Sequence, residues 1–426
     1  MRIAYLITDP GIPVRGGKGA AVHVRAMTSS LADLGHEVRV LAADTGGEEP
    51  WDARAELYSL VDSERLRTKW RGLRRILNSP DALSPTKGGG DALSPGFAEN
   101  RLREMHKLEM AGRSAEEAIR LLKANPADII LERLSPFGAA GPILSRRMNT
   151  PRIVEMNAPL TEESRRWRNL EFVDISLAAE RSALRGAAGV AAVSGPLVRR
   201  CRDLGLPADR ILLLPNGVDP DFFRPGRRNP ELASILGLTD ARVVGFAGSL
   251  KPWHGVDRLM EAFARLSDRG GRRRLLVVGD GPERARLMET ADRMRIADRT
   301  VFTGAVPHAR MPDHIRLMDV AAAPYRSEGG GYFSPLKILE FMACGIPVAA
   351  SGGGDIPRLV KPERGGLTVP EDDADALSRA LDGLLADPDR RARLGAAARS
   401  AAEERTWAAN ARRLTEFMSG IREAGG

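Results

Sequence analysis

Apolar residues along the chain occur in two kinds of pattern, short continuous runs and longer stretches with helical spacing. Near the beginning, residues 2–8 form an apolar run, residues 21–35 have apolar positions at helical intervals up to Gly35, and residues 36–44 form a second run. Continuous runs of this length are typical of strands buried in a parallel sheet, and the spaced stretch is typical of the helix that connects them. The pattern therefore predicts strand, helix and strand in this order.

The same alternation continues and then starts again after Pro215. Before Pro215 the predicted strands are 127–132, 152–156 and 189–194, and after it they are 242–250, 273–281, 300–306, 319–325 and 346–351, with a helix at 255–266. Strands that alternate with helices predict parallel sheets covered by helices on both faces. The fold class is therefore α/β, with two doubly wound, Rossmann-like domains. Residues 215–230, rich in Pro, Asn and Asp, are typical of a hinge region, and we expect one domain at 1–205 and a second at 206–404.

Length and composition agree with an ordinary globular protein of two domains. The chain has 426 residues, 43% of them hydrophobic and 28% charged. Its two cysteines, Cys201 and Cys344, form no CxxC pair, which indicates a reducing compartment. The apolar run at the N-terminus is too short for a signal peptide, and no run is long enough to span a membrane. We therefore expect a cytoplasmic location.

The net charge of +8 does not by itself indicate nucleic-acid binding. Aromatic residues make up only 5% of the chain, and basic residues cluster locally only at 65–77. A nucleic-acid-binding surface would need a basic patch with aromatic side chains for stacking. We expect no nucleic-acid partner. Residues 65–77 have apolar positions at helical spacing, so they are either a solvated helix that packs on its own domain or a peripheral contact with anionic lipid at the inner membrane.

Residues 329–357 combine a glycine strip with the beginning of a short helix. Ser334 is a favourable N-cap, Pro335 suits the first helical position, and Gly345 ends the helix. The unpaired N–H groups at such a helix N-terminus suit a phosphate, which the glycines allow to approach closely. Lys337 and Glu340 follow in the first turns, either as ligands of a bound molecule or as an ordinary surface ion pair.

Two other loops carry candidate phosphate ligands. Ser249 and Lys251 follow the first predicted strand of the second domain, and ligands of open parallel sheets bind at the carboxyl ends of the strands. Gly16 and Gly17 follow the first strand of the first domain. We therefore expect a nucleotide ligand held between two such edges, with Lys251 as a partner of its diphosphate.

The chain resembles the retaining glycosyltransferases of family 4, which have the GT-B fold with two Rossmann-like domains facing across a cleft. The motifs that carry the resemblance occur in the expected order over essentially the whole length: GGKGAAVHV, LADLGHEVRVLA, PNGVD, GSLKPWHGVDRLMEAF, LLVVGDGP, VFTGAV and SPLKILEFMACGIPVAASGGGDIP. The resemblance implies that the first domain binds the acceptor and the second binds a nucleoside-diphosphate sugar. It also implies that the helix at 405–426 packs back on the first domain.

The resemblance assigns roles to individual positions. Glu340 matches the second glutamate of the E-x7-E motif and is expected to bind the ribose hydroxyls, whereas Tyr332 stands at the first glutamate position. Ser249 and His254 stand where the family often has cations for the diphosphate, which leaves Lys251 and Lys337 for that role. Gly16 and Gly17 match the loop over the diphosphate. The expected donor contacts also include Gly281, Val306, Gly330, Gly331, Tyr332, Phe333, Ser334, Pro335 and Leu336.

The implied reaction is transfer of a hexosyl group with retention of configuration. The catalytic candidates are Lys251, Glu132 and Arg133. Glu132 and Arg133 occupy the region of the first domain where the family commonly has a histidine. The acceptor is a natural product, a polysaccharide or a lipid, and the donor carries UDP or GDP. No carboxylate pair of the hydrolase kind and no metal-ligand spacing is found, so we expect neither a covalent intermediate nor a metal cofactor.

Two other enzymatic functions share parts of these patterns. A nucleotide-sugar 2-epimerase has the same architecture. A nicotinamide-dependent oxidoreductase is suggested by GKGAAV and by Asp44 after the second strand, but Val22 replaces the third glycine of the dinucleotide fingerprint. Eight residues also separate Ile7 from Gly16, where the fingerprint needs a tight turn. The glycosyltransferase is therefore the favoured interpretation.

Overall fold

The computed structural model divides into two compact units. It describes residues 1–52, 54–61, 68–69, 72, 95–266, 272–326 and 331–425. The first unit comprises Met1–Val193, Leu197–Leu214 and Ala411–Gly426, and the second comprises Ser194–Pro196 and Pro215–Asn410. The main division thus falls after Leu214 rather than after residue 205, and the C-terminal segment of the first unit begins at Ala411 rather than at 405.

The first unit is built on a parallel sheet with the order β3-β2-β1-β4-β5-β6-β7. The apolar runs of the sequence form its central strands, whereas the short edge strands β3 and β7 were not predicted. The strands are β1 (Arg2–Ile7), β2 (Glu37–Ala42), β3 (Glu56–Ser59), β4 (Ile129–Arg133), β5 (Arg152–Met156), β6 (Gly189–Ala192) and β7 (Ile211–Leu213).

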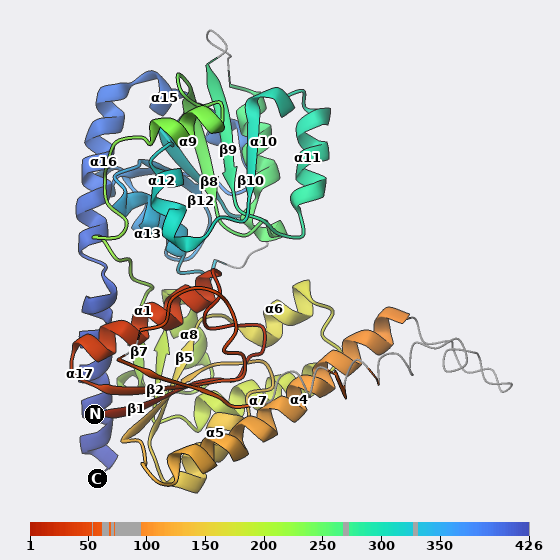
Figure 1. Cartoon of the computed structure of the whole chain (residues 1–426), viewed down its shortest axis with the longest axis vertical. Helices are drawn as coiled ribbons and strands as arrows, with labels where there is room; N and C mark the ends of the chain where they lie inside the picture. Colours follow the sequence, from red (N-terminus) through yellow and green to blue (C-terminus); the bar gives the residue numbers. More distant parts are fainter. Residues whose placement is uncertain are drawn as a thin grey trace, which may run out of the picture. The chain divides into compact units, whose positions relative to one another are not determined.

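Helices cover both faces of this sheet (Figure 1). On one face, apolar residues of α4 and α5 pack with Ala4, Leu6 and Ile130 of the strands. On the other, Phe417 and Ile421 of α17 lie so close to Gly189 of β6 that a β-carbon there would be 2.5 Å from Ile421 Cδ1. The helices are α1 (Gly19–Asp33), α4 (Pro95–Leu122), α5 (Ala140–Met148), α6 (Leu160–Trp167), α7 (Val173–Arg185), α8 (Gly195–Asp203) and α17 (Trp407–Gly425).

The second unit contains a parallel sheet with the order β10-β9-β8-β11-β12-β13. Its strands are β8 (Arg242–Ala247), β9 (Arg273–Val278), β10 (Thr300–Gly304), β11 (Val320–Pro324), β12 (Val348–Ser351) and β13 (Gly366–Val369). In both sheets the first strand of the unit lies between the second and the fourth, so the strand order reverses there. This is the doubly wound arrangement, and the predicted fold class is confirmed. Ligands of such sheets bind where the order reverses, outside the carboxyl ends of the strands.

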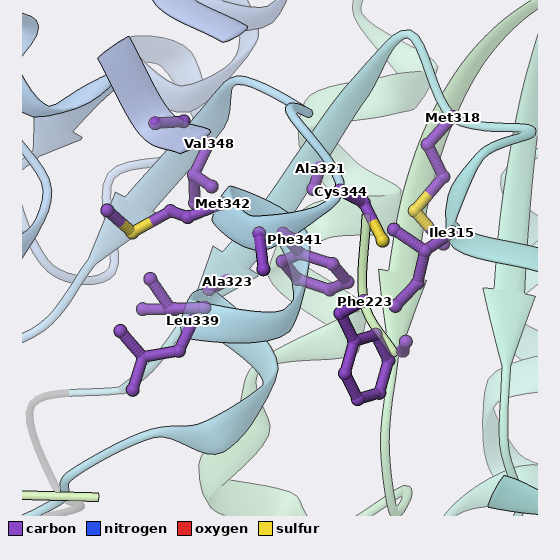
Figure 2. Packing of buried hydrophobic residues seen from close by; sticks show 14 of the residues in the cluster. Phe223, Ile315, Met318, Ala321, Ala323, Leu339, Phe341, Met342, Cys344 and Val348 are labelled. Atoms are coloured by element: carbon purple, nitrogen blue, oxygen red, sulfur yellow. The ribbon is translucent and has the colours of Figure 1, made fainter. Parts of the chain in front are cut away.

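Two apolar clusters, one on each face, form the core of the second unit. Residues of α13 belong to one cluster, residues of α10, α11 and α15 belong to the other, and α16 contributes to both. Figure 2 shows the first cluster, in which Leu339, Phe341 and Met342 of α13 lie with Ala323 and Val348 of the strands. The helices are α9 (Pro230–Ile235), α10 (Val256–Ala264), α11 (Arg284–Arg293), α12 (Met311–Ile315), α13 (Leu336–Ala343), α14 (Ile356–Leu359), α15 (Ala374–Ala386) and α16 (Pro388–Glu403).

One of the two membrane-related expectations can be compared with the described part of the chain. None of its helices is both long enough and apolar enough to cross a bilayer. Most of residues 65–77 lie outside the described residues, so the peripheral membrane contact expected there stays a prediction.

Candidate active site

The expected donor-binding residues of the second unit gather at the carboxyl edge of its sheet. Ser249 and Lys251 follow β8, Gly281 follows β9 and Val306 follows β10. The loop from Gly331 leads into α13 from the same edge, because β11 ends at Pro324 and α13 begins at Leu336. Gly330 lies outside the described residues. The point where the strand order reverses, between β8 and β11, therefore lies next to Lys251 and close to the beginning of α13.

The beginning of α13 differs from the prediction. Pro335 is the N-cap, no side chain caps the helix, and the helix runs from Leu336 to Ala343. Ser334 does not cap it because Ser334 Oγ accepts a hydrogen bond from Asn216 N at 2.8 Å, and Asn216 Nδ2 donates to Ser334 O at 2.5 Å. The prediction of Ser334 as N-cap was therefore wrong. Within the described part of the chain, no side chain accepts from the first N–H groups of α13, and an anion-binding helix terminus needs such free groups.

Lys337, in the first turn of α13, carries a buried ammonium group. Its Nζ lies 4.2 Å from the ring centroid of Phe246 and 5.2 Å from that of Tyr325. Among the described residues it has no hydrogen-bond partner. A β-carbon at Gly248 would lie 3.1 Å from Nζ, and Gly248 has φ of +133°, so a side chain at this position would be strained and would crowd the ammonium. An unpaired buried donor of this kind is costly unless a ligand pairs with it.

Glu340 and Lys337 form no ion pair among the described residues, which argues against the surface-pair interpretation. They nevertheless influence one another. Burial lowers the pKa of Lys337 to about 7, although Glu340 opposes this shift. Burial raises the pKa of Glu340 to about 7, and Lys337 opposes that shift in turn. Both groups therefore change charge near neutral pH, and the charge of each depends on what binds beside them.

His254 is a neutral side chain between positive groups. Its Nδ1 donates to Ser249 O at 2.5 Å, which directs the second ring nitrogen away from that carbonyl. Burial lowers its pKa well below the ordinary value, and the nearby charges of Lys337 and Lys251 lower it further. His254 and Ser249 thus supply no positive charge at the two positions where the family often has cations. Lys337 and Lys251 both lower the pKa of His254, so each brings positive charge close to these two positions.

Backbone packing explains part of the glycine strip before α13. Gly331 and Gly354 have φ of +62° and +65°, and a β-carbon at Gly354 would lie 1.7 Å from Gly331 O. The loop before α13 therefore lies directly against the loop after β12. Tyr332 is held by its carbonyl, which accepts from Ser194 Oγ at 2.7 Å. The ring of Phe333 stacks on Tyr325 with centroids 5.4 Å apart, so this loop is connected to the aromatic surroundings of Lys337.

The expected residues of the first unit lie on different sides of its sheet. Gly16 and Gly17 are in the loop before α1, where Gly16 N donates to Pro13 O at 2.8 Å. Glu132 and Arg133 are neighbours in β4 and therefore point to opposite faces. Glu132 is buried and pairs with Arg152, and it accepts from Gly141 N at 3.2 Å. This placement argues for a structural role of Glu132 rather than the expected catalytic role.

Arg133 belongs to a group of residues that no sequence motif indicates. Its Nη1 donates to Glu155 Oε1 at 2.5 Å, and His23 Nε2 lies 2.9 Å from Glu155 Oε2. Tyr5 and Asn157 also contact this carboxylate. The signals in the sequence were a glutamate within the apolar run 152–156 and a histidine within the apolar part of 21–35. In the described ranges, no group of three or more His, Cys, Asp or Glu side chains could hold a metal ion.

Comparisons with known proteins agree over both units. Residues 18–217 match the family described as "Glycosyl transferase 4-like domain", and residues 241–387 match "Glycosyl transferases group 1". A D-inositol 3-phosphate glycosyltransferase of Xylanimonas cellulosilytica is 31% identical over 424 residues, which are 94% of this chain and 91% of that protein. The GDP-mannose-dependent alpha-(1-6)-phosphatidylinositol monomannoside mannosyltransferase of Mycolicibacterium smegmatis is 34% identical over 298 residues, 68% of this chain and 76% of that protein.

A solved structure gives the same result for the fold. Sucrose-phosphate synthase from Thermosynechococcus elongatus matches with a TM-score of 0.75 and 21% identity, and the match covers 100% of each chain. Neither the epimerase nor the oxidoreductase is favoured by these similarities. The sequence resemblance is thereby confirmed, and the chain belongs to the family 4 glycosyltransferases with the GT-B fold.

Proposed function

We propose that this glycosyltransferase transfers a hexosyl group from a nucleoside-diphosphate sugar to a hydroxyl acceptor, with retention of configuration and without a metal ion. The observation that carries the proposal is the buried Nζ of Lys337, which has no hydrogen-bond partner among the described residues. It lies in the first turn of α13, beside the uncapped N–H groups of that helix. An anion at this position would pair with the ammonium and with the helix terminus together.

The donor would be held by groups with separate tasks. Lys337 and Lys251 neutralise the diphosphate, and the N–H groups of α13 donate to its oxygens. Glu340 accepts hydrogen bonds from the ribose hydroxyls. Because these groups are fixed by the helix and by the loop after β8, they need little reorganisation when negative charge develops on the leaving group. This arrangement supplies positive charge where other enzymes use a metal ion.

Retention follows from attack on the same face of the donor that the leaving group occupies. The bond between the anomeric carbon and the diphosphate oxygen breaks, and the bond to the acceptor oxygen forms. The proton of the acceptor hydroxyl passes to an oxygen of the departing diphosphate. In this proposal no covalent intermediate forms, and positioning and electrostatic stabilisation supply the catalysis.

The relatives narrow the choice of substrates to test first. Both named relatives act on inositol compounds, one on an inositol phosphate and the other on a phosphatidylinositol mannoside. One of them is named as dependent on GDP-mannose. We therefore propose GDP-mannose as the first donor, with inositol phosphates and phosphatidylinositol lipids as the first acceptors.

Calorimetric titration with GDP and with UDP, followed by a screen of donors, tests the proposal. One of the two nucleotides should bind, and its sugar conjugates should support transfer to a hydroxyl. Analysis of the product by NMR should show the anomeric configuration of the donor. Failure of both nucleotides to bind, or inversion of configuration in the product, would contradict the proposal.

Substitution of the donor-binding residues should lower transfer in a folded protein. Lys251→Ala and Glu340→Ala should each reduce kcat/KM about tenfold, because each removes a hydrogen bond that involves a charged group. Lys361→Ala is the matched control, since this lysine of the second unit has a side chain that is 50% exposed. Its kinetics should equal those of the unmodified protein. Equal rates for Lys251→Ala and Lys361→Ala would refute the role of Lys251.

A further inference from the structure

The first unit contains a carboxylate that is buried and surrounded by donors. Glu155 Oε2 accepts from Tyr5 OH at 2.7 Å and lies 2.9 Å from His23 Nε2. Glu155 Oε1 accepts from Arg133 Nη1 at 2.5 Å and from Asn157 Nδ2. The side chain of Glu155 is only 2% exposed, and that of His23 is 4% exposed. Two strands besides β5, together with α1, thus converge on one buried carboxylate.

The Glu155 cluster is buried, but part of it lies at the carboxyl edge of the sheet. Asn157 directly follows Met156, the last residue of β5, and Arg133 is the last residue of β4. Both therefore lie at the carboxyl edge of the sheet, and β4 is one of the two strands between which the strand order reverses. Ligands of doubly wound sheets bind at this edge. Arg133, Glu155 and Asn157 all belong to the first unit, so their position at this edge follows from that unit by itself.

Stability alone is a poor explanation of the Glu155 cluster. Glu155 and Arg133 lose their hydration when they are buried, which costs free energy. Well-packed apolar residues of similar volume often make a protein as stable as a buried ion pair does, or more stable. Burial by itself would raise the pKa of Glu155, but His23 and Arg133 outweigh this effect and hold the pKa well below its ordinary value. Glu155 is therefore ionised and accepts hydrogen bonds only.

The ionised carboxylate fixes the orientation of the Asn157 amide. Because Glu155 can only accept, the NH2 group of Asn157 must face it, and the amide oxygen must face the other way. Asn157 is partly exposed, and no described residue donates to its Oδ1. The protein thus presents a fixed hydrogen-bond acceptor at the edge of the sheet. A hydroxyl group is a natural partner for it, since a hydroxyl can donate without introducing a charge.

We propose that Asn157 Oδ1 binds a hydroxyl of a polyhydroxylated acceptor, a sugar or a cyclitol, and that Glu155 is the positioning residue that orients Asn157. This inference rests on the proposed function, because it concerns the acceptor of that reaction. It assigns a substrate contact to the first unit, where Asn157 and Glu155 were not among the expected site residues. The donor site in the second unit does not depend on it.

Asn157→Ala tests the contact through a comparison of transfer with donor hydrolysis. The probes are GDP-mannose as donor and D-inositol 3-phosphate as acceptor, followed by phosphatidylinositol vesicles and methyl α-mannoside if the first acceptor is not used. The KM for the acceptor should rise about 3- to 10-fold, the effect of one lost hydrogen bond. Hydrolysis of the donor without acceptor and the Kd for GDP should stay unchanged, because neither requires the acceptor site.

Two further variants separate positioning from a general structural effect. Asn125→Ala changes an asparagine that precedes β4, at the opposite edge of the same sheet, and should leave the acceptor KM unchanged. Glu155→Gln keeps the volume but cannot hold the Asn157 amide in one orientation, so it should raise the same KM. In that background Asn157→Ala should add little, since the two residues act as a unit.

Each outcome decides the inference. An unchanged acceptor KM in Asn157→Ala overturns it while the proposed function stands. A parallel fall of transfer, donor hydrolysis and thermal midpoint in Asn157→Ala shows a structural role only and also overturns it. Binding of nucleotide without transfer to any of the three acceptors contradicts the proposed function itself, and the inference falls with it.

Discussion

The two units treat buried charge in opposite ways. In the first, Glu155 is surrounded by donors from Tyr5, His23, Arg133 and Asn157. In the second, Lys337 Nζ is buried between aromatic rings and has no hydrogen-bond partner among the described residues. Both groups lie near the carboxyl edges of their sheets, where ligands of doubly wound sheets generally bind. The difference is the one expected if the first edge is organised without a ligand and the second is completed by the anion that we propose.

This comparison predicts that removal of Glu155 lowers the free energy of unfolding, whereas removal of the Lys337 ammonium does not. The effect at Glu155 is the largest. Glu155→Ala should lower the free energy of unfolding by about 3–5 kcal/mol, because Arg133 and His23 would remain buried without their partner. Urea unfolding of the two proteins measures the difference. Glu117→Ala is the control, since it breaks an exposed ion pair with Arg120 on α4 and should change stability by less than about 1 kcal/mol. Equal effects of the two variants would remove the basis of the comparison.

Lys337→Met should separate stability from binding. The affinity for the nucleotide should fall about 10- to 150-fold, the effect of a lost hydrogen bond to a charged group of about 1.5–3 kcal/mol. The free energy of unfolding without ligand should not fall, because methionine fills the space without burying an unpaired donor. Calorimetry with GDP and UDP, and urea unfolding at pH 7, measure the two quantities. A variant that loses stability but keeps its affinity would show that Lys337 serves the fold.

The smallest effect concerns pH. Burial lowers the pKa of Lys337 to about 7 in the free protein, and a bound diphosphate should raise it again. Affinity should therefore be constant below pH 7 and fall above it, by at most about tenfold per pH unit, because binding then takes up a proton. Calorimetry with a nucleotide sugar at pH 8, in two buffers that differ in ionisation enthalpy, counts this proton.

Variants identify the group responsible for this pH dependence. Glu340 is a second candidate for this proton uptake, because burial raises its pKa to about 7 as well. Glu340→Gln should keep the proton uptake, whereas Lys337→Met should abolish it. The opposite pattern would assign the titration to Glu340.

The sequence predicted the parts of the fold that depend on local pattern. Continuous apolar runs identified the central strands of both sheets, and motif order identified the family. The strands that were missed, β3, β7 and β13, are short edge strands. The beginning of α13 was misplaced because Ser334 is bound by Asn216, which lies 118 residues away in the chain. Local propensity carries no information on such a contact.

The candidate site was predictable where a motif names the residue. The loop after β8 and the family pattern predict Lys251, and the first turns of α13 predict Lys337 and Glu340. Their assignment to the donor stays a prediction. Glu132 and Arg133 are both catalytic candidates by their place in the sequence. Neighbouring side chains of a strand point to opposite faces of the sheet, so the two cannot act at the same place. Glu155 and His23 lie within apolar segments, and only the tertiary structure shows that they meet.

The contact between Gly331 and Gly354 limits which positions of the proposed donor-binding loop can be varied in the laboratory. An alanine at Gly354 would place a methyl group 1.7 Å from Gly331 O, so it would force the two loops apart. Libraries that randomise either glycine would mostly yield misfolded loops. Selection for new sugar donors should instead vary Tyr332 and Phe333, whose side chains can change while the backbone beneath them keeps its path.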